Sequence, residues 1–214
     1  MLRPNRSDLA VLLSTGANAL DIPLSDLQIN QFISYLEDLK EWNRQINLTS
    51  ITADKEIIEK HFLDSLAGLK AIEKRPDQTM LDIGTGAGFP GVPLKIAFPG
   101  LRLRLLESSQ KRAAFLHHLM GKLRLPEVTI LNQRIENLLN MNRRFDLIVT
   151  RAFAKIQIAI EWALPLLAPR GKLILYQGRA QSQIQEMKGW EATIPYELPF
   201  SKIRRSLEIF SRSS

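Results

Sequence analysis

The stretch Leu81-Asp82-Ile83-Gly84-Thr85-Gly86-Ala87-Gly88-Phe89-Pro90-Gly91 decides the fold class of this chain. A short apolar run ends in an acid, glycine then recurs at every second position, and a segment that can form a helix, Val92 to Phe98, follows. Glycines at this spacing let the backbone turn sharply between a strand and a helix, and they let a ligand approach without meeting a Cβ atom. The pattern predicts a ligand-binding loop.

A second acid strengthens this prediction. The next apolar run, Leu101 to Leu106, ends in Glu107, which lies 19 positions beyond Gly88. An acid at that place suits the two hydroxyls of a ribose. Together, the loop and the acid indicate an adenosine-type cofactor.

Two cofactors fit the same residues. The spacing Gly86-x-Gly88-x-x-Gly91 satisfies the dinucleotide fingerprint, so an NAD-dependent oxidoreductase is a rival interpretation. We expect Asp82 at the mouth of the loop, where a carboxylate repels a pyrophosphate and favours the ammonium and sulfonium of S-adenosylmethionine. The fully alternating glycines also favour the methyl donor. A glycine-rich turn that binds nothing is the third interpretation.

Charge and composition narrow the class of partner. The chain has 214 residues and a net charge of +7, with 29 Lys and Arg against 22 Asp and Glu. The acids are concentrated in the first 75 residues, so the positive charge belongs mainly to the remainder, which favours RNA or DNA as a partner. The absence of cysteine excludes disulfides, thiolate nucleophiles and thiolate metal sites. With no apolar run near the ~20 residues that span a bilayer, we expect a cytoplasmic protein without membrane contact.

The order of apolar segments predicts an α/β fold. We expect a helical extension over residues 1–75, with Ser25 as a helix N-cap, and the catalytic domain over residues 76–214. Strands alternate with helices such as Gln110 to Leu123 and Gln181 to Gly189, which predicts a mainly parallel, doubly wound sheet whose last two strands form an antiparallel hairpin at one edge. The seven expected strands are Thr79 to Ile83, Leu101 to Glu107, Val128 to Asn132, Asp146 to Thr150, Leu173 to Gln177, Thr193 to Glu197 and Leu207 to Ser211.

The residues that follow each strand are expected to line the ligand crevice. Ile135 and Glu136 come after the third strand and are placed to edge an adenine, although a solvated helix start explains them equally well. Arg151 follows the apolar fourth strand, so we expect it to face the donor's carboxylate, a phosphate or the acceptor. Phe153 could stack on a base.

Features that the chain lacks also bear on the acceptor. No Asp/Asn-Pro-Pro-aromatic segment, which commonly serves amine methylation, follows the fourth strand, and no cysteine is present for carbon-5 methylation of pyrimidines. An acceptor with a free lone pair, such as guanine N7, needs neither device. Catalysis then reduces to aligning nitrogen, methyl and sulfur and holding the base.

The histidines do not predict a metal site. His117 and His118 are neighbours on an expected helix, so their rings diverge, and His61 stands alone. His61 and Asp64 lie three apart and can share a helical face, which we interpret as a local structural pair.

Several motifs occur together in a fixed order, and with them the chain resembles the bacterial RsmG family, also called GidB. These motifs are Trp42-Asn43, Asn47-Leu48-Thr49, His61-x-Leu63-Asp64-Ser65, the glycine run from Asp82 to Leu94, Lys111-Arg112 and Thr150-Arg151-Ala152-Phe153-Ala154. The resemblance runs from about residue 30 to residue 180.

The resemblance implies a class I, Rossmann-like methyltransferase fold with a seven-stranded sheet, and methyl transfer from S-adenosylmethionine to N7 of a guanine in 16S ribosomal RNA. We further expect a monomer without a metal ion, with Arg151 acting by positioning only and no general base. A non-catalytic RNA-binding assembly factor is the remaining alternative. By position, the expected cofactor contacts are Asp82, Gly84, Gly86, Gly88, Phe89, Glu107 at the ribose, Ile135, Glu136 and Arg151. The family often carries Lys-Gly after the fifth strand; here Gln177-Gly178 stands there, and Arg179 could supply the charge.

Overall fold

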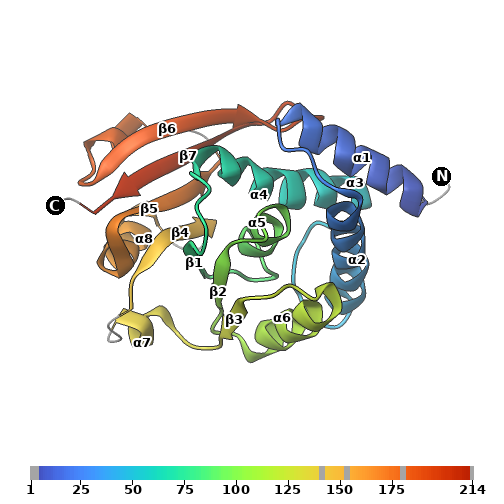
Figure 1. Cartoon of the computed structure of the whole chain (residues 1–214), viewed down its shortest axis with the longest axis horizontal. Helices are drawn as coiled ribbons and strands as arrows, with labels where there is room; N and C mark the ends of the chain where they lie inside the picture. Colours follow the sequence, from blue (N-terminus) through green and yellow to red (C-terminus); the bar gives the residue numbers. More distant parts are fainter. Residues whose placement is uncertain (1–4, 140–142, 152–154, 179–181, 213–214) are drawn as a thin grey trace.

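The computed structural model describes residues 5–139, 143–151, 155–178 and 182–212, and the strands form one sheet in the order β3-β2-β1-β4-β5-β7-β6 (Figure 1). The pairs β1–β2, β1–β4, β2–β3 and β4–β5 are parallel, whereas β7 runs antiparallel to both of its neighbours, β5 and β6. The predicted doubly wound sheet with an antiparallel edge hairpin is confirmed. The strands are β1 (Thr79–Ile83), β2 (Arg102–Leu106), β3 (Val128–Leu131), β4 (Phe145–Arg151), β5 (Leu167–Gln177), β6 (Trp190–Glu197) and β7 (Arg204–Ser211).

Several expected elements differ from those observed at their ends, most of all β5 and the helix expected before β6. β5 begins at Leu167 rather than Leu173, because the chain bulges beside Phe145 and pairs with β4 on both sides of the bulge. The helix expected over Gln181 to Gly189 is only a short 3-10 turn, η4 (Ser182–Glu186), and residue 181 lies outside the described residues. Gly189 has φ +85° and its carbonyl accepts from Ser211, so the chain turns there into β6 and leaves no room for a longer helix.

The described part of the N-terminal extension, residues 5–75, is largely helical, as expected. α1 (Arg6–Ala19) and α2 (Asp26–Asn43) are each capped by a side chain, and Ser25 is the N-cap of α2: its Oγ accepts from Gln28 N at 3.3 Å, while Gln28 Oε1 accepts from Ser25 N at 2.8 Å. A continuous helical segment follows, which we call the N-terminal helical rod. It is made of α3 (Asp54–Ile57), the π-helix η1 (Ile58–Leu63), α4 (Asp64–Leu66) and the 3-10 helix η2 (Ala67–Ala71). The sequence pattern did not indicate the π-helical turn.

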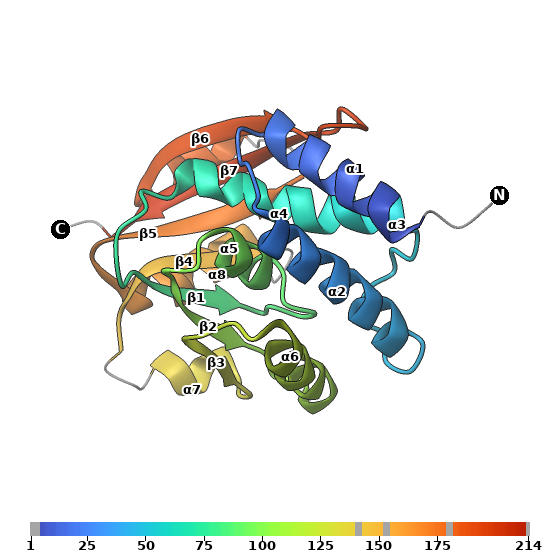
Figure 2. The same ribbon diagram turned by 45° about the vertical axis from the view of Figure 1, so that its right-hand side comes forward.

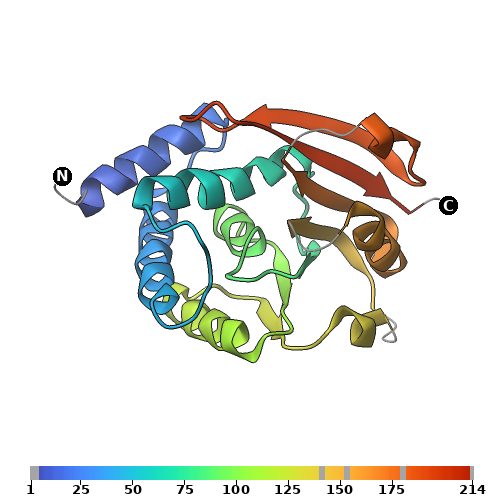
Figure 3. The ribbon, with the colours of Figure 1, turned by 180° about the vertical axis from the view of Figure 1, so that it is seen from behind.

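Helices cover both faces of the sheet (Figures 1 and 2). One face carries the N-terminal helices together with α5 (Gly91–Ala97) and α6 (Gln110–Leu123), and the view from behind shows α7 (Ile135–Leu139) and α8 (Ile156–Ala163), joined to β5 by η3 (Leu164–Leu166), on the other (Figure 3). Successive strand residues therefore enter different cores: Met80 belongs to the cluster under the N-terminal helices and Leu81 to the cluster under α8. This is the alternation that a sheet buried on both faces requires. The division at residues 75 and 76 stays a prediction, since the N-terminal helices and the sheet share one core.

Candidate active site

The loop between β1 and α5 is held in an open turn by its glycines. Gly86 has φ +60°, and a Cβ atom built on it would meet nothing nearer than the Gly84 carbonyl at 4.0 Å, so the space above Gly86 is free for a ligand. Gly88 has φ +101°, and a Cβ atom there would lie 2.6 Å from the Tyr35 hydroxyl. Tyr35 also donates a hydrogen bond to the Ala87 carbonyl, so α2 supports the loop from one side.

Asp82 lies beneath this loop and not at its mouth, contrary to expectation. Its side chain has no exposed surface, and its Oδ2 accepts hydrogen bonds from Thr85 Oγ1 at 2.6 Å and Gly91 N at 2.7 Å. Burial raises its pKa to about 7. The acid therefore fixes the shape of the turn, and it lines neither of the cavities described next.

Two cavities open on either side of the loop, and Gly84 lines both. The larger, which we call the first cavity, has a volume of about 730 Å³ and lies between the loop, the π-helix η1 and the carboxyl ends of β4 and β5. The second cavity has a volume of about 450 Å³ and lies beyond the ends of β2 and β3. Both therefore lie at the carboxyl edge of the parallel strands, where open α/β sheets bind ligands.

The second cavity brings together four of the residues expected to bind the cofactor: Gly84, Glu107, Ile135 and Glu136. The Glu107 carboxylate is oriented by backbone amides, since its Oε2 accepts from Gly86 N at 3.0 Å and its Oε1 from Ser109 N at 2.8 Å. The charges that line this cavity are balanced, with Glu107 and Glu136 against Arg112 and Arg134.

The first cavity holds Gly84, Gly86, Phe89 and Arg151 from the expected set, whereas Gly88 lines neither cavity. The buried Phe89 ring stacks on Tyr35, with centroids 5.3 Å apart, and on His61, with centroids 4.6 Å apart. The guanidinium carbon of Arg151 lies 5.2 Å from the centre of the same ring. An aromatic wall thus runs along this side of the cavity.

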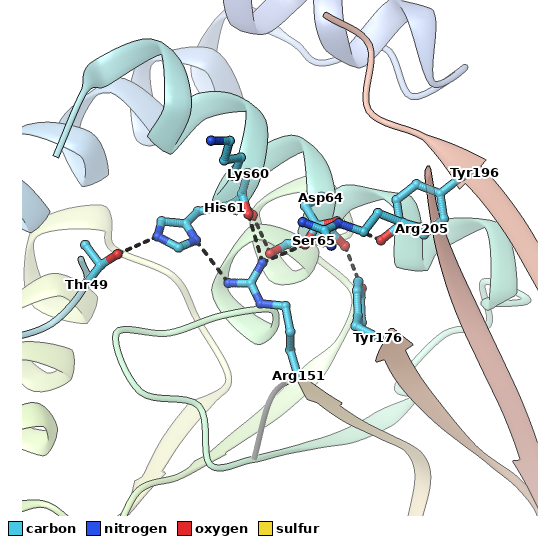
Figure 4. Close-up of polar contacts among 9 residues, drawn as sticks. All are labelled: Thr49, Lys60, His61, Asp64, Ser65, Arg151, Tyr176, Tyr196 and Arg205. Atoms are coloured by element: carbon cyan, nitrogen blue, oxygen red, sulfur yellow. Dashed lines mark hydrogen bonds and ion pairs between the residues drawn. The ribbon is translucent and has the colours of Figure 1, made fainter. Parts of the chain in front are cut away.

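Arg151 reaches from the end of β4 to the π-helical segment (Figure 4). Its Nη1 donates to Asp64 Oδ2 at 2.9 Å and to the Lys60 carbonyl at 3.2 Å, and its Nη2 donates to His61 Nδ1 at 3.3 Å. An arginine has no acceptor, so His61 Nδ1 must be unprotonated and the ring proton must sit on Nε2. That nitrogen lies 2.7 Å from Thr49 Oγ1 and donates to it.

The titratable groups around Arg151 are held in one protonation state. Burial, followed by the positive charge of Arg151, lowers the pKa of His61 to about 3, so the ring is neutral at pH 7. Burial and then the charge of Asp64 raise the pKa of Tyr176 and of Tyr196 above the ordinary value. Both hydroxyls stay protonated; Tyr196 donates to Asp64 Oδ1 at 2.7 Å and Tyr176 to the Ser65 carbonyl at 2.6 Å.

Several of these residues escaped the sequence reading. The sequence indicates His61 and Asp64 as a local pair, but each contacts Arg151, which lies 90 and 87 positions further along the chain. Their spacing of three was a real signal of a shared face, without any indication of what that face meets. Tyr196, from the edge hairpin, carries no signal, and Arg205 stands out only as part of a basic cluster. Two expected residues, Phe153 and Arg179, lie outside the described residues.

The first cavity has a strongly positive lining. Of the described residues, four cations line it, namely Lys60, Arg151, Lys155 and Arg205, against a single acid, Asp64. Asp64 is itself engaged by Arg151, and its Oδ1 lies 3.9 Å from Arg205 Nε. Within the parts of the chain that the structure describes, no cluster of three or more His, Asp or Glu side chains could hold a metal ion, and no helix is long and apolar enough to cross a membrane.

The chain matches one known protein family over most of its length. The family model described as rRNA small subunit methyltransferase G matches residues 28–198. A ribosomal RNA small subunit methyltransferase G from Acetivibrio thermocellus is 35% identical over 95% of this chain and 88% of its own length, and one from Thermoanaerobacter sp. is 37% identical over 94% and 89%.

Solved structures show the same fold at low identity. MtNAS in complex with MTA and tNA has a TM-score of 0.59 at 12% identity and covers 100% of this chain and 92% of its own. TrmN from Thermus thermophilus has a TM-score of 0.58 at 16% identity, over 73% of this chain and 53% of its own.

Proposed function

The chain belongs to the rRNA small subunit methyltransferase G family, and we propose that it transfers the methyl group of S-adenosylmethionine to N7 of a guanine in 16S ribosomal RNA. One observation carries the proposal: Gly84 separates a charge-balanced cavity from a strongly basic one. A donor bound across this glycine would have its nucleoside on one side and its reactive end on the other.

The residues of the second cavity fit an adenosine. Glu107 presents a carboxylate whose orientation is fixed by two backbone amides, and a carboxylate accepts hydrogen bonds from both hydroxyls of a ribose. Ile135 and Glu136 would border the adenine. A Cβ atom built on Gly86 would meet no side chain within 4 Å, so the loop leaves room for the donor above it.

The first cavity would hold the donor's reactive end and the acceptor base. S-adenosylmethionine supplies a methyl group activated by a sulfonium. Arg151, fixed by Asp64 and His61, would pair with the donor's carboxylate or with the RNA, and its planar guanidinium suits either anion. The other lining cations, Lys60, Lys155 and Arg205, would attract the RNA backbone.

Methylation at N7 of guanine is compatible with the protonation states of the side chains in the first cavity. This nitrogen already has a lone pair, so no proton has to be removed before it attacks. His61 is neutral but uses Nδ1 to accept from Arg151 and its ring proton to contact Thr49, so neither nitrogen is free to act as a base. Arg151 and its partners would then act by positioning, which can supply a large part of a barrier reduction. We also propose that the protein acts in the cytoplasm, where ribosomal RNA is found, and that it acts as a monomer.

Methyl transfer can be measured directly. Incubation with labelled S-adenosylmethionine and undermodified small subunits or 16S RNA should label one guanine, identified as N7-methylguanosine by mass spectrometry. The matched control is an RNA in which 7-deazaguanine replaces that guanine, because it lacks only the attacking nitrogen and should accept no label. Absence of label on every ribosomal substrate would refute the proposal.

Two rivals can be separated by ligand titration. Trp162 lines the second cavity, so binding of either cofactor there should change its fluorescence. We expect a response to S-adenosylmethionine and none to NADH, with Trp162→Phe as the control for the origin of the signal. A response to NADH alone would favour an oxidoreductase. Salt-sensitive RNA binding without any affinity for the donor would favour an assembly factor.

A further inference from the structure

A third cavity adjoins the first one and has no part in the function proposed above. Its volume is about 230 Å³, and it lies where the end of α2 faces the chain that leads into α3. Thr49 and Ile51 line both this cavity and the first. Its full lining is Leu39, Lys40, Asn43, Arg44, Thr49, Ile51, Thr52 and Ile57.

Hydrogen bonds fix the wall, the segment of chain that separates the first cavity from the third. The Asn43 side chain makes three hydrogen bonds to it: Oδ1 accepts from Leu48 N at 2.8 Å and from Thr49 N at 2.9 Å, and Nδ2 donates to the Thr49 carbonyl at 2.9 Å. The Thr49 hydroxyl accepts from Ile51 N at 3.1 Å and contacts His61 on the other side. These hydrogen bonds fix the position of the first cavity relative to the third, and one turn of the chain lies between them.

The third cavity combines an apolar floor with a basic rim. Its floor is apolar, since Leu39 and Ile57 are both buried. Its rim is basic: Lys40 pairs with Asp54, whereas the side chain of the exposed Arg44 makes no hydrogen bond or ion pair with any described residue. An apolar surface can pack against a base or a ribose, and an unpaired guanidinium beside it can pair with a phosphate, so the cavity suits one nucleotide of an RNA strand.

We propose that the third cavity binds the nucleotide next to the acceptor guanine. The inference rests on the proposed function, because it takes the first cavity as the place of the acceptor base. A strand whose base enters the first cavity must carry its neighbour across the wall formed by Thr49 and Ile51, and the third cavity lies directly beyond that wall. With about a third of the volume of the first, it takes the base or ribose of one nucleotide and not a longer segment.

Filling the cavity tests the proposal. Thr52 is exposed and lines only the third cavity, so Thr52→Trp should occupy the space, raise the KM for undermodified 16S RNA at least tenfold, and leave the affinity for S-adenosylmethionine unchanged by calorimetry. The matched control is Ser50→Trp, which adds the same bulk to the same loop outside the cavities. Equal KM values for wild type and Thr52→Trp would overturn the proposal.

A second variant removes the charge without touching the fold. Arg44→Ala should lower the magnitude of the slope of log K for RNA binding against log salt by about 0.7, as expected for one lost phosphate contact on a single strand. Lys188→Ala, at an exposed lysine that lines none of the three cavities, should leave the slope as it is. An unchanged slope for Arg44→Ala would contradict the proposal, while methyl transfer by the wild type would show that the proposed function stands regardless.

Discussion

The first and second cavities flank the same glycine but are assembled in different ways. The second cavity is lined by short segments that follow β1, β2 and β3 directly, together with Trp162 of α8. The first is lined by residues from the N-terminal helical rod, from β4 and β5, and from the edge hairpin, up to Arg205. Their charge differs too: balanced in the second cavity, four cations against one acid in the first.

We propose that this difference separates recognition of the donor from recognition of the RNA. A charge-balanced pocket with one well-held carboxylate suits a nucleoside, whereas a basic cavity suits a polyanion. Under this proposal, a substitution in one cavity should change the affinity for one ligand, the donor or the RNA, and leave the affinity for the other unchanged.

The largest effect is expected at the glycine loop that both cavities depend on. Gly86→Asp should abolish binding of S-adenosylmethionine, because a carboxylate would enter the open space of the loop beside Glu107, in a backbone conformation of φ +60° that side chains rarely adopt. Isothermal titration calorimetry measures this loss. Gly121→Asp, at a glycine of α6 whose added Cβ atom would contact nothing within 4 Å, is the control. Unchanged affinity in Gly86→Asp would overturn the placement of the donor.

A large loss of stability is expected in the first cavity when Arg151 loses its charge. Arg151→Met would leave Asp64 buried and without its closest cation, which costs about 3–5 kcal/mol of the free energy of unfolding. Urea denaturation measures this cost. The double variant Arg151→Met with Asp64→Asn should recover a substantial part of it, because the unpaired charge is gone. Full additivity of the two single changes would show that the pair is not coupled.

A crossed pair of variants tests the division itself. Glu107→Gln should weaken the affinity for S-adenosylmethionine by about 2 kcal/mol, the worth of a charge-assisted hydrogen bond, and leave RNA affinity unchanged. Lys155→Glu, on the rim of the first cavity, should raise the KM for RNA and leave donor affinity unchanged. Both are measured with the same two ligands. A variant that changes both affinities equally would show that the donor and the RNA are bound at one site and not in two separate cavities.

The smallest effect is a dependence of stability on pH that belongs to His61. Its pKa is about 3 in the folded protein, below the ordinary value of 6.5, so the unfolded chain binds the extra proton between these values. Its contribution is fully present above pH 6.5 and is lost as pH falls toward 3. Between pH 7 and pH 5 the wild type should lose about 2 kcal/mol relative to His61→Gln. A difference that is constant over this range would mean that the ring is not held neutral.

The sheet and the second cavity were largely predictable, because their signals are local. Strand, glycine loop and acid follow one another along the chain, so Gly84 and Glu107 meet wherever this segment folds as a strand, a turn and a strand. Even so, a local pattern could not place Asp82: its position two residues before the first glycine is the same whether the side chain points into the crevice or beneath the loop. Packing of the loop over Gly91 decided that it lies beneath.

The amino-acid sequence by itself determined the strands, the glycine turn and the position of Glu107, since each depends on residues close together in the chain, and the order of its motifs indicated the family. Only the tertiary structure decided what Arg151 contacts, because Asp64 lies 87 positions away from it in the chain and meets it through helix-on-sheet packing. The same holds for the third cavity, which exists because Asn43 fixes the chain around Thr49 against α2. Contacts between residues far apart in the chain leave no periodic pattern in the sequence. Their geometry is set only when the helices and the sheet pack together into the cores.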